Sequence, residues 1–390
     1  MQPNLITRIQ SIDILRGLVM LIMALDHVRD FFHETAVTFD PLNLDTTTTP
    51  LFLTRWITHF CAPIFVFLSG VSAYISGQKK TKAALGSFLI KRGVWLILIE
   101  LVIVSLAITF NPLYNFLILQ VIWAIGWSMI FLGLLVRTSY AAIVVIGVLL
   151  VLGHNIFDIY PAAGSSPVMQ VLFTSPGGII PLSADRLLLV AYAILPWTGI
   201  MFLGYAVGRW YSKDFPPEKR RRLLVTAGGL ALLLFILLRA SGLYGDPTSW
   251  DRSREGMNGF LSFVNVSKYP ASLQFTCLMV GTGLLLLSIF ERVRGKLWDI
   301  FMVYGKVPFF YYVLHFYLIH ILCVIFFYAS GRTEIASPDS PFLFRPADFG
   351  YSLPVVYAVW LFVIVVLYQP CRWFIEVKKR NAGKWWVSYV

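Results

Sequence analysis

The sequence predicts an all-α protein, a polytopic transmembrane helical bundle that forms a single domain over residues 1–390. Of its 390 residues, 58% are hydrophobic and only 13% are charged, and the mean hydropathy is +0.74. Soluble globular chains carry about 25% charged residues, so this chain has too little polar surface to cover soluble cores. Its apolar residues also fall in long uninterrupted runs, which indicates helices that span a bilayer.

About ten runs reach the roughly 20 apolar residues that a spanning helix needs. The first run carries charged residues in its second half and is followed by no small-residue cleavage site, so we expect a retained helix and not a signal peptide. The expected spans cover residues 12–32, 52–77, 85–109, 115–136, 139–157, 186–211, 221–242, 268–291, 303–329 and 352–376.

The distribution of basic residues predicts the orientation of these spans. If the N-terminus lies in the cytoplasm, the basic segments 79–92, 209–222, 292–306 and 372–384 all lie inside, and most acidic residues lie outside. This asymmetry follows the positive-inside rule, so both ends are expected in the cytoplasm. The net charge of +12 therefore indicates contact with the lipid bilayer of a cell membrane, most simply a bacterial inner membrane, and no nucleic-acid partner.

The first expected span contains the most informative residues. Ionisable side chains at membrane depth are costly, which makes them functional candidates. Helical spacing places four of these residues on one face: Asp26, Arg29, Asp30 and His33. His27 lies adjacent to that face. A buried imidazole can act as a general base when a carboxylate orients it, so we expect His27 or His33 to be catalytic, with Asp26 or Asp30 beside it. The simpler alternative is that the acids and Arg29 only neutralise one another.

Two further candidates lie at the start of the second span. Arg55 and His59 are one helical turn apart, and the connection from the first span is short enough for His59 to face His33. We therefore expect His59 to belong to the catalytic group, and Arg55, together with Arg29 of the first span, to bind substrate.

Later spans add substrate-binding candidates. His315 lies near the middle of the span 303–329, with Tyr311 one turn before it, and both are expected to line the site. His320 points about 140° away from His315 and is expected to be a packing residue. Lys268, at the outer end of the span 268–291, is expected to anchor a carboxylate or phosphate of the acceptor, or alternatively to anchor the helix at the interface.

The sequence resembles the bacterial branch of the heparan-α-glucosaminide N-acetyltransferase-like family of transmembrane acyltransferases. The clearest matches are Ser-Ile-Asp-Ile-Leu-Arg-Gly at 11–17 and Pro-Ile-Phe-Val-Phe-Leu-Ser-Gly at 63–70. Weaker similarity is present at Ser-Lys-Tyr-Pro, residues 267–270, and around Pro308–His315.

This resemblance implies an acyltransferase that moves an acetyl or other acyl group from cytoplasmic acyl-CoA to a hydroxyl or amine of an extracytoplasmic glycan or small molecule. It also implies a possible homodimer. In the family a helix-1 Asn, followed by a His, carries the chemistry; the Asn position coincides with His27, but no His here matches the second position in register. The resemblance therefore leaves the general base open between His33, His27 and His59.

Transfer from a thioester independently requires a base for the acceptor and hydrogen-bond donors for the developing oxyanion. The phosphates of acetyl-CoA, or of another acyl-CoA, would then bind at the basic cytoplasmic mouth, where Arg16 and Lys306 are the cofactor-binding candidates.

Two other functions fit intramembrane charges. A transporter or flippase of a polar or lipid-linked substrate is the first, but the sequence has no corresponding Gly/Pro-broken helices in two halves. A haem- or quinone-binding redox protein is the second, but carboxylates beside His27 suit acid–base work better than haem ligation. The four cysteines all lie within expected spans and form neither a disulfide framework nor a spaced metal motif.

Overall fold

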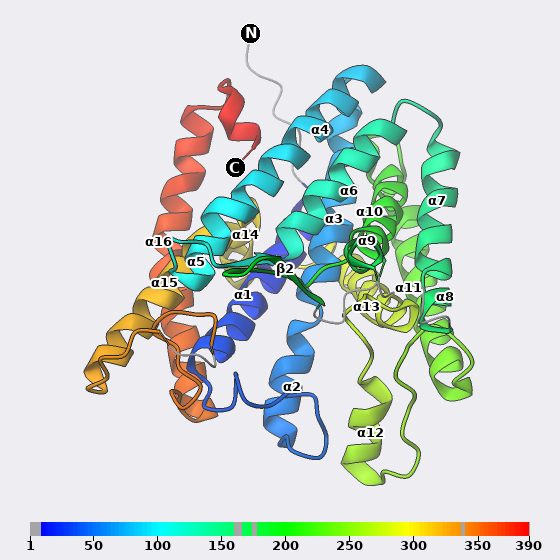
Figure 1. Cartoon of the computed structure of the whole chain (residues 1–390). Helices are drawn as coiled ribbons and strands as arrows, with labels where there is room; N and C mark the ends of the chain where they lie inside the picture. Colours follow the sequence, from blue (N-terminus) through cyan, green and yellow to red (C-terminus); the bar gives the residue numbers. More distant parts are fainter. Residues whose placement is uncertain (1–8, 160–165, 174–177, 337–339, 390) are drawn as a thin grey trace. The chain divides into compact units, whose positions relative to one another are not determined.

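The computed structural model describes residues 9–159, 166–173, 178–336 and 340–389. Most of these residues are helical, and one small β-sheet is present (Figure 1). The chain divides into two compact units that are described separately below. Unit 1 consists of Met1–Cys61, Ile103–Tyr114 and Ile289–Val390, and unit 2 consists of Ala62–Val102 and Asn115–Ser288.

Unit 1 is built around its first helix, α1 (Gln10–Phe32), which is buried along most of its length. Segments from both ends of the sequence pack against it, so distant parts of the chain contribute to one core. The helices in contact with α1 are α2 (Thr49–Thr58), α14 (Lys296–Lys306), α15 (Pro308–Ala329) and α16 (Leu353–Arg380). The short α5 (Ser105–Thr109) packs against α15, and a 3₁₀ turn, η4 (Trp385–Ser388), follows α16.

Helices α1 and α14 cross at two glycines, with their backbones in direct contact. A Cβ atom on Gly17 would lie 1.8 Å from the carbonyl oxygen of Phe301, and one on Gly305 would lie 1.9 Å from that of Asp13. No side chain fits in such a space, so only glycine permits this approach. The crossing also brings the beginning of α1 next to the end of α14.

Replacing Gly305 by alanine is therefore expected to destabilise the protein. The added methyl group must push the two helix backbones apart, which should lower the free energy of unfolding by about 3 kcal/mol. Gly229→Ala in α11 (Pro217–Ser241) is the matched control, because a Cβ there would have no atom within 4 Å. Thermal unfolding in detergent measures both variants, and equal midpoints for the two would contradict the close crossing.

Unit 2 contains the remaining helices and the sheet. A π-helical turn, η1 (Glu100–Val104), extends α4, and η1 runs from unit 2 into unit 1. The other elements are α3 (Cys61–Gly77), α4 (Lys82–Ile99), α6 (Val121–Leu135), α7 (Tyr140–Gly153), α8 (Ile156–Ile159), α9 (Pro167–Leu172), α10 (Ile194–Gly208), η3 (Arg209–Tyr211), α11, α12 (Gly256–Val264) and α13 (Leu273–Phe290).

The sheet is a departure from the predicted all-α fold. It has three strands in the order β1-β3-β2, formed by β1 (Phe116–Leu119), β2 (Gly178–Ser183) and β3 (Arg186–Val190). β3 pairs in parallel with β1 and antiparallel with β2. The residues of β1 and β3 were expected to begin the spans 115–136 and 186–211. Runs of Leu, Ile and Phe this short fit a buried strand as well as a helix end, so periodicity does not distinguish the two.

Two predicted helices are each divided in two at a proline. The expected span 303–329 breaks at Val307, between α14 and α15, because proline disfavours helical geometry in the residue before it. The expected span 52–77 likewise breaks at His59 and Phe60, between α2 and α3. There, the ring of Pro63 would clash with the carbonyl four residues earlier in a continuous helix.

Among the described residues, seven helical segments are long and apolar enough to cross a membrane, and three of them join consecutive elements: Thr49–Gly77 (α2 and α3), Lys82–Thr109 (α4, η1 and α5), Tyr140–Asp158 (α7 and α8), Pro217–Ser241, Leu273–Phe290, Pro308–Ala329 and Leu353–Arg380. Of the other predicted spans, α1 contains five charged residues. α6 and α10 have 15 residues each, about 22 Å of helix against a hydrocarbon core of about 30 Å. The protein is thus a multi-pass membrane protein, while about ten spans and two cytoplasmic ends stay predictions.

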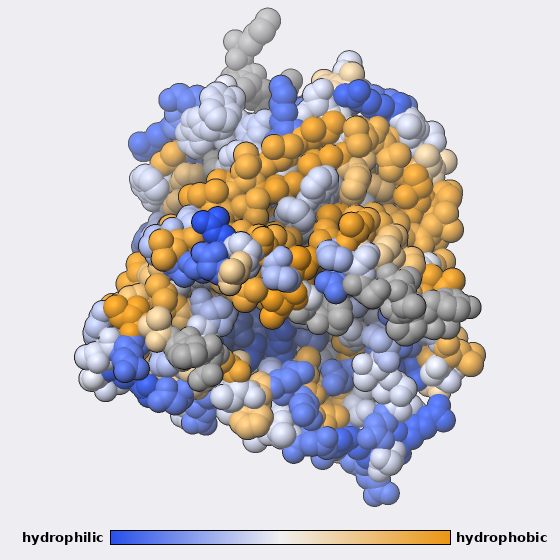
Figure 2. All heavy atoms as spheres, in the orientation of Figure 1, coloured by the Kyte–Doolittle hydropathy of each residue, from blue (hydrophilic) through white to orange (hydrophobic). Residues whose placement is uncertain are grey.

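The surface agrees with a lipid environment. Figure 2 shows broad hydrophobic areas on the visible face. Exposed leucine and valine side chains include Val94 and Leu98 on α4, and Leu230 and Leu237 on α11. Apolar surface of this extent is unusual for a soluble monomer and is expected where helices face lipid chains.

Candidate functional site

A network of four charged residues lies in unit 1, at the C-terminal half of α1. One carboxylate oxygen of Asp26 accepts a hydrogen bond from Arg29 at 3.1 Å, and the other accepts one from Arg55 of α2 at 2.5 Å. Arg29 also donates to Asp30 at 2.6 Å. Asp26 and Arg29 are buried, whereas the side chain of Asp30 is 42% exposed. The acids and Arg29 therefore neutralise one another, as the simpler sequence interpretation proposed, but Asp30 has a second neighbour.

That neighbour is His27, one turn earlier on α1. Its Nδ1 lies 3.8 Å from Oδ2 of Asp30, and its side chain is 15% exposed. On its other side, the ring centroid of His27 lies 5.2 Å from that of His315 and 4.2 Å from that of Phe316, both on α15. The structure thus places an imidazole between a carboxylate and a second imidazole, an arrangement suited to proton transfer.

His315 is completely buried, and a hydrogen bond to the backbone determines which ring nitrogen carries the proton of the neutral form. Its Nδ1 lies 3.2 Å from the carbonyl oxygen of Tyr311. A carbonyl only accepts, so the neutral ring carries its proton on Nδ1 and has a lone pair on Nε2. The Tyr311 ring stacks on the His315 ring with centroids 5.5 Å apart. Sequence spacing predicted this pairing of Tyr311 with His315.

Two polar atoms of this pair have no partner in the part of the chain that the structure describes. Nε2 of His315 and the hydroxyl of Tyr311 are buried and make no hydrogen bond to any described residue. Buried polar atoms are nearly always paired, and leaving one unpaired costs about 1–3 kcal/mol. His315 thus has an acceptor and Tyr311 a donor that no described residue uses, and the His315 ring is the one that lies against His27.

His33 has a different environment at the C-terminal end of α1. Its Nδ1 accepts a hydrogen bond from the backbone N–H of Thr35 at 3.2 Å, which places the proton of the neutral ring on Nε2. Its carbonyl accepts a hydrogen bond from Arg345 at 2.7 Å. Burial, helped by the Arg29 guanidinium, lowers the pKa of the His33 imidazole. His27 and His33 are six residues apart on one helix, hence about 120° apart around its axis.

Two other histidines of unit 1 lie in packed surroundings. His59 is buried at the C-terminal end of α2, next to the break before α3. His320 stacks on Phe110 with ring centroids 3.7 Å apart, and its two nitrogens lie 3.1 Å and 2.9 Å from the carbonyl oxygens of Ala107 and Leu343. His320 is thus a packing residue, in agreement with the sequence prediction.

The two predicted cofactor-binding residues meet at the crossing of α1 and α14. Arg16 donates to the carbonyl oxygen of Gly305 at 3.1 Å, and Lys306 is the next residue in the chain. Arg16 also bonds to Asp13 at 3.2 Å, and the Arg16 side chain is 17% exposed. The close approach of Gly17 and Gly305 is therefore what brings Arg16 to the backbone at the end of α14, beside the position of Lys306.

Lys268 belongs to unit 2, where it is buried between two aromatic rings. Its ammonium lies 5.1 Å from the ring centroid of Tyr269 and 5.7 Å from that of Tyr192. The side chain is only 6% exposed, and no carboxylate among the described residues lies within ion-pair distance. Cation–π contacts stabilise such an ammonium, and the charge remains available to an anionic group.

Glu100 is a buried polar residue that the sequence interpretation did not include in the site. It is completely buried in unit 2, at the start of the π-helical turn η1, and its Oε1 accepts the backbone N–H of Gln120 at 2.8 Å. π-helical turns often occur at functional positions, and a carboxylate inside an apolar run is itself a signal of function. Gln120 lies between the end of β1 and the start of α6. Its hydrogen bond to Glu100 therefore gives the carboxylate a structural role, which is to hold this connection against η1.

Comparison with known proteins identifies the family. A family model described as heparan-alpha-glucosaminide N-acetyltransferase, catalytic, matches residues 8–239, more than half of the chain. The matched part includes α1 and α2, and therefore His27 and its charged neighbours, and it ends before the weaker similarities noted at 267–270 and in α15. The comparison with curated proteins gives no match. On the family match, this chain belongs to the heparan-alpha-glucosaminide N-acetyltransferase family of membrane acetyltransferases.

Proposed function

We propose that this protein transfers an acetyl group, or another acyl group, from cytoplasmic acyl-CoA to a hydroxyl or amine of an extracytoplasmic acceptor, most simply a sugar. The observation that carries the proposal is the grouping of His27 with Asp30 and His315 in a member of an N-acetyltransferase family. The family uses acetyl-CoA as its donor, which supports an acyl-CoA donor for this chain.

His27 is the general base in this proposal. It removes the proton of the attacking hydroxyl or amine while the new C–O or C–N bond forms at the thioester carbonyl. The C–S bond then breaks, and the departing CoA thiolate takes the proton back from the imidazolium. Asp30 orients the His27 ring and stabilises its charged form. His33 is the alternative base, but its Nδ1 lone pair already accepts the Thr35 N–H.

Other residues of unit 1 bind and stabilise the reacting groups. The Tyr311 hydroxyl is a buried donor without a described partner, and it is suited to the oxyanion that develops on the thioester oxygen. Nε2 of His315 is the matching acceptor for a second polar group of the substrate. Arg29 and Arg55 hold Asp26 and thereby fix the helix that presents His27. Arg16 and Lys306 supply positive charge for the phosphates of the donor.

Ligand-dependent stability and acyl transfer together test this function. Saturating acetyl-CoA, at 100 times its dissociation constant, should stabilise the purified protein in detergent by about 2.7 kcal/mol. A nucleotide that lacks the pantetheine arm should stabilise it less. Radiolabelled acetyl-CoA should then label glucosamine or a related sugar when protein is present.

Two results would contradict the proposal. One is the absence of both stabilisation and transfer with acetyl-CoA and with longer acyl-CoAs. The other is uptake of a polar substrate by proteoliposomes without consumption of an acyl donor, which would favour a transporter or flippase.

A further inference from the structure

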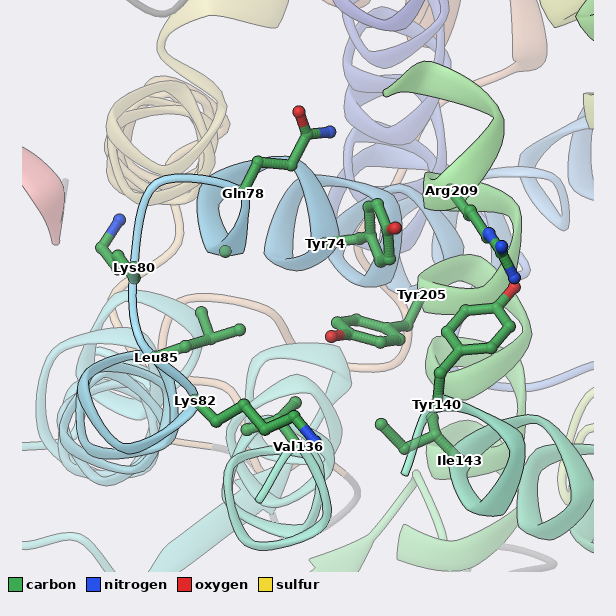
Figure 3. Close-up of a pocket in the computed structure, with 11 residues that line it drawn as sticks. Tyr74, Gln78, Lys80, Lys82, Leu85, Val136, Tyr140, Ile143, Tyr205 and Arg209 are labelled. Atoms are coloured by element: carbon green, nitrogen blue, oxygen red, sulfur yellow. The ribbon is translucent and has the colours of Figure 1, made fainter. Parts of the chain in front are cut away.

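Unit 2 contains a pocket that the proposed mechanism does not use. The pocket has a volume of about 430 Å³ and lies among the ends of helices α3, α4, α6, α7 and α10 (Figure 3). This volume is within the range of about 300–1,000 Å³ that is usual for small-molecule sites. The residues that line it are Tyr74, Gly77, Gln78, Lys80, Lys82, Leu85, Val136, Tyr140, Ile143, Tyr205 and Arg209.

Three of the residues that line the pocket are cations, and Figure 3 shows them on different sides of it. Lys80, Lys82 and Arg209 are exposed, whereas Leu85 and Tyr205 deeper in the pocket are buried. None of the lining residues is acidic. In the described part of the chain, no carboxylate lies within ion-pair distance of any of the three cations. The pocket therefore has an excess of positive charge that no carboxylate of the described residues neutralises.

Neutral contacts hold these cations in position. Lys82 donates to the carbonyl oxygen of Thr138 at 2.5 Å, and Lys80 donates to that of Ser76 at 2.9 Å. The Arg209 guanidinium lies over the Tyr140 ring, 5.2 Å from its centroid. These contacts fix the long side chains without cancelling their charge, so less conformational entropy is lost when an anion binds.

The opposite part of the pocket is aromatic and apolar. The rings of Tyr74 and Tyr205 meet edge to face, with centroids 5.1 Å apart, and Figure 3 shows both rings directed into the pocket beside Tyr140. Leu85, Val136 and Ile143 complete this wall. Such a surface accommodates a flat ring or an acyl chain, whereas an isolated inorganic ion would leave it unused.

We propose that this pocket binds a phosphate monoester that carries an aromatic or acyl group. Arg209, which lies beside the tyrosines, binds the phosphate oxygens through charge-assisted hydrogen bonds, and Lys80 and Lys82 add positive potential around the pocket. The three tyrosines and the aliphatic wall contact the rest of the ligand. Two molecules offer this chemistry at a membrane: a nucleotide, such as adenosine 3′,5′-bisphosphate, and a phospholipid with a terminal phosphate. The site is argued from unit 2 alone and does not depend on the catalytic assignment in unit 1.

Direct titration of the full-length protein in a neutral detergent tests the site. The two probes are adenosine 3′,5′-bisphosphate and dihexanoyl phosphatidic acid, and adenosine is the control ligand without phosphate. At least one phosphate probe should bind, and added salt should weaken that binding. Binding of the bisphosphate alone identifies a nucleotide site, and binding of the phosphatidic acid alone identifies a lipid site. Binding of both supports the shared phosphate chemistry.

The variant pair assigns the binding to this pocket. The double variant Lys82→Gln with Arg209→Gln should lower the affinity for the probe at least tenfold. The double variant Lys219→Gln with Arg222→Gln removes two cations of the same unit that lie outside the pocket. It should bind the probe with an affinity within threefold of the wild-type affinity. Tyr205→Leu should weaken binding while all three cations remain, which guards against a folding defect in the double variant. The proposal is overturned if neither probe binds, or if the pocket variants bind as tightly as the wild type.

Discussion

His27→Ala should lower the rate of acyl transfer by about 10² to 10⁴-fold, the usual contribution of a positioned general base. The variant should melt within a few degrees of the wild type, because the His27 side chain is partly exposed and makes no short hydrogen bond to a described residue. Added imidazole should restore part of the lost rate, since a small base can enter the space left by the side chain. A purely structural role for His27 would not give this rescue.

His33→Ala is the matched comparison for His27. In the structure the His33 ring accepts a hydrogen bond from the Thr35 N–H, and the His33 carbonyl oxygen accepts one from Arg345. We therefore expect this variant to lose stability while it retains most of its transfer rate per folded molecule. If His33→Ala abolished transfer and His27→Ala did not, the base would be His33, and Asp30 would have no catalytic role through His27.

Asp26→Asn should destabilise the protein by about 3–5 kcal/mol, the usual cost of breaking a buried ion pair by removing one partner. Asp26 bonds to both Arg29 and Arg55, so the substitution removes a carboxylate that links α1 to α2. The melting temperature in detergent measures the effect, and transfer activity should fall with it because α2 is no longer held against α1.

Asp30→Asn is the control for this effect, because the side chain is 42% exposed and its ion pair with Arg29 is partly hydrated. A surface-like pair of this kind contributes about 0–1 kcal/mol, so the melting temperature should change little. Transfer should nevertheless slow, because His27 loses the charge that orients it. Equal melting temperatures for Asp26→Asn and Asp30→Asn would contradict the structural role given to Asp26.

The catalytic candidates show how far sequence reasoning reached. Helical spacing on one helix correctly paired Asp26 with Arg29 and Tyr311 with His315, because residues three or four apart always face one another. Spacing could not show that His27 meets His315, because the two residues are separated by 288 positions (315 − 27) and belong to different helices. It also could not place the proton of His33, which the Thr35 N–H determines.

The sequence by itself determined the membrane environment, the helical class and the family, because each of these depends on composition, run length or short motifs. Only the tertiary structure decided where runs of apolar residues become strands, where Pro308 and Pro63 divide a span, and which charged groups meet. Apolar content fixes whether a segment is buried, but it contains no information about its partner. Partner choice instead depends on shape, as where Gly17 and Gly305 let two backbones touch and bring Arg16 to the carbonyl oxygen of Gly305.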